Sequence, residues 1–208
     1  MARIKLTKTE LKAQGDALKR YLRFLPMLQL KKQQLQSEIA SISAAAEAVA
    51  AEEAALRGRV SRWAGLAARD EEALAGLATL REVKTSVANI AGVSIPVFES
   101  VATDFRELDA WETEPWTDDA AKAVAEGIEL RCRREVFEEQ KRLVEEELRQ
   151  TSQRVNLFEK VKIPECREAI RVIKIALGDE QTAAVTRGKI AKSRTPAGAG
   201  AGREAGAA

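Results

Sequence analysis

The strongest constraint on this chain is a repeat of large apolar side chains at alternating intervals of four and three over residues 4–63. Fourteen of the eighteen repeat positions carry an apolar residue. A 3.5-residue spacing drifts against the 3.6 residues per turn of a straight helix, so a helix with this stripe wraps a partner as a left-handed supercoil. At about 1.5 Å per residue the segment spans about 90 Å. Such a rod needs a second helix to cover its apolar seam.

The last third of the chain carries the only comparable stripe, so we expect it to fold back and pair with the first third. Leu130, Phe137, Val144 and Phe158 lie on one set of positions spaced by seven, with Thr151 as its polar member, and past Pro164 the register slips. We interpret the slip as a stutter that locally unwinds the supercoil. The predicted seam residues are Leu11, Leu18, Leu25, Leu28, Leu35, Ile39, Ile42, Val49, Leu56, Val60, Val144, Leu148, Val155, Phe158, Ile170, Ile173 and Leu177.

The composition suits long helices and argues against chemistry. Of the 208 residues 32% are charged and 4% aromatic, and histidine is absent, which removes the usual general base and metal ligand. No glycine-rich phosphate loop is present, and Cys132 and Cys166 lie about 50 Å apart on one expected helix, so they are expected to stay reduced. No apolar run is long enough to span a membrane. We therefore predict a cytoplasmic, non-enzymatic protein without catalytic, cofactor or metal sites.

The middle of the chain breaks the helical period. Residues 83–98 are rich in β-forming side chains around Asn89 and Gly92, which predicts a short hairpin with an irregular turn. Pro96 suits an edge position because it lacks a backbone donor. Two strands alone are marginal, so the hairpin should lie against the coiled coil or receive a partner.

These patterns predict a predominantly all-α fold, a long antiparallel left-handed two-helix coiled coil with a β-hairpin and a short helix in its middle segment. The expected parts are residues 1–80 for the N-terminal long helix, 81–117 for the hairpin and short helical connector, 118–192 for the C-terminal long helix, and 193–208 for a disordered tail.

Basic residues cluster at both ends of the expected helix pair. If the two helices begin and end together, position 4 lies near position 188 and the clusters meet at one tip. In that register Pro26 faces Pro164 and the pair shares a bend; alternatively, each proline is accommodated separately. The basic residues are Arg3, Lys5, Lys8, Lys12, Arg187, Lys189 and Lys192.

Three stretches resemble the D subunit of the V/A-type rotary ATPases, in the order found in that family. They are LTKTELKAQGDALKRYLRFLPMLQLKKQQL at residues 6–35, NIAGVSIPVF at 89–98 and RVNLFEKVKIPECREAIRVIKIAL at 154–177. The last is the most specific, because RVN followed by IP and a run of isoleucine and arginine is unusual for a generic coiled coil. The Ala-rich segment 44–55 and the Ala/Gly tail depart from the family pattern.

The resemblance implies a rotor axle that links a catalytic hexamer of A and B subunits to the membrane ion-translocating ring, in ATP synthesis or ion transport. It implies that the basic tip enters the hexamer bore. It further implies partners in the F subunit and in the funnel-shaped socket subunit above the ring, with no membrane insertion of the chain itself. We expect the hairpin to meet the F subunit or the socket through Ile90, Val93, Ile95, Pro96 and Val97.

Two other classes share some of these features. A coiled-coil scaffold, or the soluble stalk-like component of a flagellar or secretion export ATPase, would show the same heptads but would not need NIAGVSIPVF. A basic helical nucleic-acid binder is disfavoured, because the positive charge is confined to one end and no aromatic residues interleave with it as a stacking platform requires.

Overall fold

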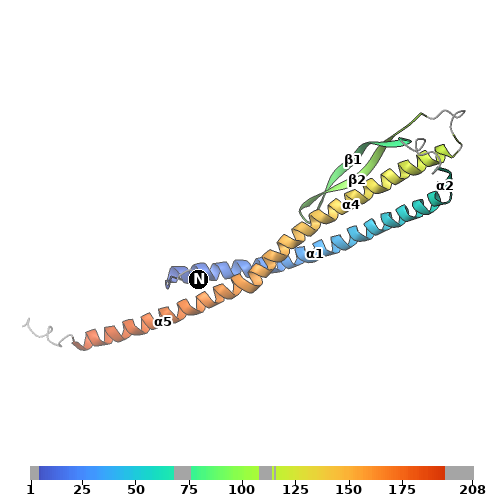
Figure 1. Cartoon of the computed structure of the whole chain (residues 1–208). Coiled ribbons are helices and arrows are strands. Elements are labelled where there is room, and N and C mark those ends of the chain that lie inside the picture. Colours follow the sequence, from blue (N-terminus) through green and yellow to red (C-terminus); the bar gives the residue numbers. More distant parts are fainter. Residues whose placement is uncertain (1–4, 68–75, 108–113, 115, 195–208) are drawn as a thin grey trace, which may run out of the picture. The chain divides into compact units, whose positions relative to one another are not determined.

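The computed structural model describes residues 5–67, 76–107, 114 and 116–194 (Figure 1). In chain order the elements are α1 (Lys8–Ser61), α2 (Ala64–Ala67), β1 (Ala78–Ile90), β2 (Val93–Phe105), α4 (Thr117–Leu157), the π-helical turn η1 (Phe158–Lys162) and α5 (Ile163–Arg194). The chain divides into two compact units, residues 1–27 with 155–208 and residues 28–154. The predicted fold class, long helices around an antiparallel hairpin, is confirmed.

In the unit formed by residues 28–154, α1 and α4 run antiparallel. Ion pairs join them at several levels: Lys31 with Glu147, Glu53 with Arg134 and Arg59 with Glu126. The residue numbers rise along α1 as they fall along α4. The pairs therefore fix both the direction and the register of the two helices.

The apolar seam of α1 in this unit is formed by one of the two interleaved heptad sets. Leu35, Ile42, Val49 and Leu56, seven residues apart, are all buried. The other set, which includes Lys32 and Glu53, is half-buried. Positions that can hold a charged side chain therefore flank the seam, and the continuous apolar set fills it.

The hairpin is longer than the sequence indicated. Both strands have 13 residues, so the pairing extends beyond residues 83–98, and it contains register shifts between Leu80 and Glu82 and between Lys84 and Thr85. The turn has two residues, Ala91 at φ 51° and Gly92 at φ 86°, as in a type I′ turn. The backbone N–H of Gly92 donates to the Asn89 side-chain oxygen at 3.0 Å. The expected irregular turn was therefore wrong.

The hairpin lies along the helix pair (Figure 1), and its turn end contributes to the core. Ile95 is buried with Leu35, Ile42 and Val144, and Ile90 and Val93 pack against this cluster. The Gln140 side chain on α4 donates from Nε2 to the backbone oxygen of Pro96 at 2.5 Å. This contact satisfies a buried glutamine and holds the β2 backbone to α4.

A second cluster closes the other end of this unit. Leu77, at the start of the hairpin, packs with Ala120 and Ala121 of α4. Trp63 and Trp116 cover this cluster, with ring centroids 6.5 Å apart. The first long helix ends at Ser61 rather than near residue 80. The short helix α2 follows it at residues 64–67, before the segment 81–117 in which a short helix was expected.

In the other unit, α1 meets the returning helix at an aromatic contact. The rings of Tyr21 and Phe158 lie 5.0 Å apart at 48°. The register expected from helices that end together would instead place residue 169 beside Tyr21, so the pairing differs by about eleven residues. Because Pro26 and Pro164 follow the contact on antiparallel helices, they lie on opposite sides of it, about 16 Å apart along the axis. Pro26 sits inside a continuous α1.

The register slip near Pro164 takes the form of a π-helical turn. The buried stripe of the returning helix passes from Val155 to Ile163, an interval of eight residues where the heptad would give seven. In η1 the backbone N–H of Ile163 bonds to the oxygen of Phe158, five residues earlier. The wider turn absorbs the extra residue, so the slip is a single-residue insertion rather than a stutter.

Candidate interaction surfaces

The predicted seam residues all lie in protected positions. Within the described part of the chain each of them is buried or half-buried. The least exposed are Leu35, Val144 and Ile173, each with no exposed surface. The seam joins the helices and leaves other faces for partners.

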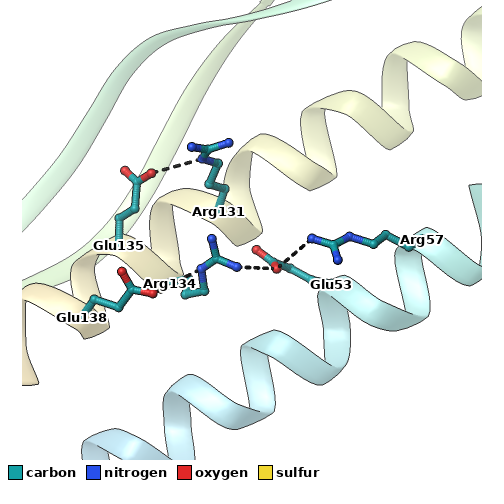
Figure 2. A network of polar contacts seen from close by, with 6 residues as sticks. All are labelled: Glu53, Arg57, Arg131, Arg134, Glu135 and Glu138. Carbon is teal, nitrogen blue, oxygen red and sulfur yellow. Dashed lines mark hydrogen bonds and ion pairs between the residues drawn. The ribbon is translucent and has the colours of Figure 1, made fainter.

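A polar network spans the two helices beside the seam (Figure 2). Arg134 on α4 reaches Glu53 on α1, with Nη1 2.8 Å from Oε2. Glu53 also lies 3.7 Å from Arg57, and Arg134 Nε lies 3.4 Å from Glu138, within ion-pair distance but without a hydrogen bond. The Glu53 side chain is only 13% exposed, so this pair is the best shielded of the cross-helix pairs.

The two cysteines are buried, Cys132 on α4 and Cys166 on α5. Burial raises the pKa of both thiols, and the neighbouring carboxylates Glu135 and Glu165 add to the rise. Both thiols are therefore poor nucleophiles at neutral pH. In the described residues no group of three or more His, Cys, Asp or Glu side chains is placed to hold a metal, and no described helix could span a membrane.

The two basic clusters are exposed but are not brought together. Lys5, Lys8 and Lys12 are exposed, and Arg3 lies outside the described residues. Arg187, Lys189 and Lys192 lie on the stretch of α5 from residue 178 to 194, which is exposed throughout. In the register of the Tyr21–Phe158 contact, Lys8 is level with residue 171, about 24 Å along the axis from Arg187. The helices do not end together as predicted, because α5 continues beyond α1.

An exposed apolar flank accompanies the Tyr21–Phe158 contact. Phe24 and Met27 on α1 and Leu157 and Val161 on the returning helix are 39–60% exposed. Relative to the seam, all four fall at heptad positions on the same side of an antiparallel pair. The heptad pattern did not predict this flank, because it identifies only the apolar residues that lie on the seam. Large apolar residues at positions off the seam would have indicated the flank.

The predicted contact residues of the hairpin have two roles. Ile90, Val93 and Ile95 face the helices and anchor the hairpin, and Pro96 and Val97 are half-buried. The large apolar side chains that the hairpin exposes are instead Leu80, Phe105 and above all Val87, which is 78% exposed. Val87 pairs with Pro96, so both side chains lie on the face opposite Ile95.

The fold and these surfaces define a class of protein in which an antiparallel helix pair carries a packed β-hairpin and exposed helical faces. The family of the ATP synthase D subunit matches residues 10–193, so the match includes both long helices and the hairpin. The chain belongs to this family.

Curated relatives agree over nearly the same span. The V-type ATP synthase D subunit of Borreliella burgdorferi is 43% identical over 193 residues, covering 93% of this chain and 95% of the relative. The D subunits of Chlamydia muridarum and Chlamydia caviae are 36% and 35% identical over 196 residues, covering 93% of this chain and 96% and 94% of the relatives. The resemblance seen in the sequence is thereby confirmed.

Proposed function

We propose that this chain is the central shaft of a V-type rotary ATPase, turning inside a hexamer of A and B subunits. The observation that carries the proposal is a family match that runs through both helices and the hairpin. The shaft would couple rotation to ion movement through a membrane ring, in the direction of either ATP synthesis or ion transport. The chemistry would belong to its partners, and the chain would stay at the cytoplasmic surface of the membrane.

The antiparallel pair has the properties that a shaft requires. An uninterrupted apolar seam resists separation of α1 and α4, and cross-helix ion pairs resist sliding. A sliding step would have to break the pairs and move the seam by a whole heptad at once. An asymmetric rod within a threefold ring touches each catalytic unit differently, so turning it biases their open and closed states.

The terminal helices supply the surface for the hexamer bore. Between residues 17 and 27, α1 carries three basic residues and no acidic one. The exposed apolar flank of Phe24, Met27, Leu157 and Val161 lies in the same region, and the exposed end of α5 adds Arg187, Lys189 and Lys192. We propose that this surface meets apolar and acidic or carbonyl groups on the inner wall of the hexamer.

The hairpin is proposed to contact the F subunit or the socket subunit. Deleting residues 86–96 would also remove Ile95 from the core, so that deletion tests folding as well as binding. The exposed face with Val87 and Pro96 permits a cleaner test. On this proposal Val87→Lys abolishes the partner contact and leaves the fold intact, whereas Val124→Lys on the exposed side of α4 serves as the matched control.

Affinity purification of the tagged full chain from native membranes tests the assignment. The expected result is recovery of A, B and F subunits in fixed ratio. A charge-neutral variant of Lys5, Lys8, Lys12, Arg187, Lys189 and Lys192 should lose hexamer binding while it keeps the F subunit. Recovery of the chain with none of these subunits, under conditions that preserve ATPase activity of the complex, would contradict the proposal.

A further inference from the structure

The π-helical turn η1 is a local change of winding inside one unit of the chain. All five of its residues, Phe158–Lys162, are exposed or half-exposed, whereas Val155 before it and Ile163 after it are buried. The turn itself therefore adds little to the core, and its form is set by the buried residues on either side of it. The two buried residues that bracket it fix how many residues must lie between them.

The eight-residue interval explains why the helix widens here. Eight residues of regular α-helix would place Ile163 about 80° from Val155 around the axis, which would turn Ile163, Cys166 and Ile173 away from α1. The i→i+5 bond from Ile163 to Phe158 removes this offset by placing one more residue in the turn. The π form thus keeps the stripe buried.

Pro164 removes part of the cost of the π turn. Proline has no N–H, so an α-helical bond to the oxygen of Lys160 is impossible, and its ring would crowd that oxygen in a regular helix. The wider turn immediately before Pro164 relieves this crowding. The α and π forms of this segment therefore differ little in hydrogen bonding. The α form is disfavoured mainly because it turns Ile163, Cys166 and Ile173 away from α1.

We propose that η1 is the torsional adapter of the helix pair. By this we mean that, when the pair is twisted, η1 switches between π-helical and α-helical winding, which changes the number of residues in that turn by one. The switch rotates the face of α5 by about 100°, the angle of one residue, about its own axis. Tyr21 stacks on Phe158 at the start of the turn and marks the end that stays in place. The source of the twist, rotation of a shaft, rests on the proposed function. The switch between π and α winding does not, because it is a property of the free chain.

Deletion of Lys160 tests the switch, because it restores the seven-residue interval and leaves an exposed side chain out. In the free full chain, amide exchange at residues 159–163 should be slow in this variant and about tenfold faster in the wild type. The melting temperature of the variant should be equal or higher. Deletion of Ala50, exposed in the middle of α1, is the matched control and should lower the melting temperature sharply, because it breaks an intact heptad.

A second variant separates the extra residue from the proline. Pro164→Ala should keep fast exchange at residues 159–163, since the eight-residue interval remains. Three results would each overturn the adapter. The first is equal amide exchange in the wild type and the Lys160 deletion, the second is a lower melting temperature for that deletion, and the third is slow amide exchange in Pro164→Ala. In the assembled complex the Lys160 deletion should narrow the angular fluctuation of the stalled shaft about threefold, and unchanged fluctuation would also overturn it. Failure of the wild-type chain to bind the hexamer would instead overturn the proposed function.

Discussion

Arg134 and Glu53 lie on different helices and form a shielded ion pair, with Nη1 of Arg134 2.8 Å from Oε2 of Glu53. Their side chains are 34% and 13% exposed. Glu53 occupies a heptad position that would otherwise carry an apolar residue. The Glu53 carboxylate is stable beside the seam when Arg134 lies opposite it on α4. A shift of one helix along the other would separate the two charges, so the pair favours one register of the helices.

Removing one partner of this pair should destabilise the protein more than removing an exposed pair. For Arg134→Ala we expect the free energy of unfolding to fall by about 1–3 kcal/mol, because Glu53 loses the nearer of its two basic partners in a largely buried position. Arg142→Ala, which breaks an exposed pair with Glu139 on the same helix, should lower the free energy of unfolding much less. Urea unfolding followed by circular dichroism measures both values. Equal losses would show that the cross-helix pair does not fix the register.

The anchoring role of the hairpin depends on Ile95, which is 3% exposed in the core. Ile95→Ala should lower the free energy of unfolding by about 2–4 kcal/mol through lost burial and a cavity between the hairpin and helices. Val87→Ala on the opposite face should change it by less than about 0.5 kcal/mol. Thermal unfolding of the two variants provides the comparison. If Ile95→Ala were neutral, the hairpin would not be held by this cluster.

The hairpin turn contains an alanine in a left-handed conformation. Ala91 has φ 51°, where an L side chain costs about 1 kcal/mol and glycine does not. Ala91→Gly should therefore stabilise the protein by up to about 1 kcal/mol, less the added entropy of glycine in the unfolded chain. Gly92→Ala, at φ 86°, should destabilise it. The two variants should shift the urea midpoint in opposite directions, and a shift in the same direction would contradict the observed turn.

A buried hydroxyl lies on the seam of α4. Thr151 is 1% exposed, and within the described part of the chain its Oγ1 has no hydrogen-bond partner. Thr151→Val keeps the shape and removes the unsatisfied group, so the free energy of unfolding should rise by about 1 kcal/mol. Thr182→Val is the control, because the exposed Thr182 hydroxyl donates to the Gly178 oxygen. Calorimetry should show a higher melting temperature for the Thr151 variant alone.

The helical seam and the hairpin could be predicted from the sequence because each depends on a local period. Apolar residues at sevens identified Leu35, Ile42, Val49 and Leu56 as seam positions, and β-forming residues identified the strands. The relative register of the helices could not be found in this way. A heptad repeat is satisfied by any shift of seven residues, and the choice depends on contacts such as that of Lys31 with Glu147, which join residues distant in sequence.

The surfaces for partners were only partly predictable. The basic residues are visible in the sequence, but their separation along the helices depends on the register. The hairpin residues predicted to bind a partner were its most apolar ones. Apolar residues can equally well pack in the core and anchor the hairpin, as Ile95 does. Val87 on β1 is exposed and Ile95 on β2 is buried because they lie on opposite faces of the hairpin.

Direct observation of rotation tests the proposed shaft most directly. Val87→Cys offers an exposed thiol on the hairpin for attachment of a bead, while the buried Cys132 and Cys166, whose pKa values are raised, should stay unlabelled. With the A and B hexamer fixed to a surface and supplied with ATP, we expect continuous rotation of the bead in one direction, in three equal parts per turn. A bead that stays at one angle while the same complexes hydrolyse ATP would contradict the shaft.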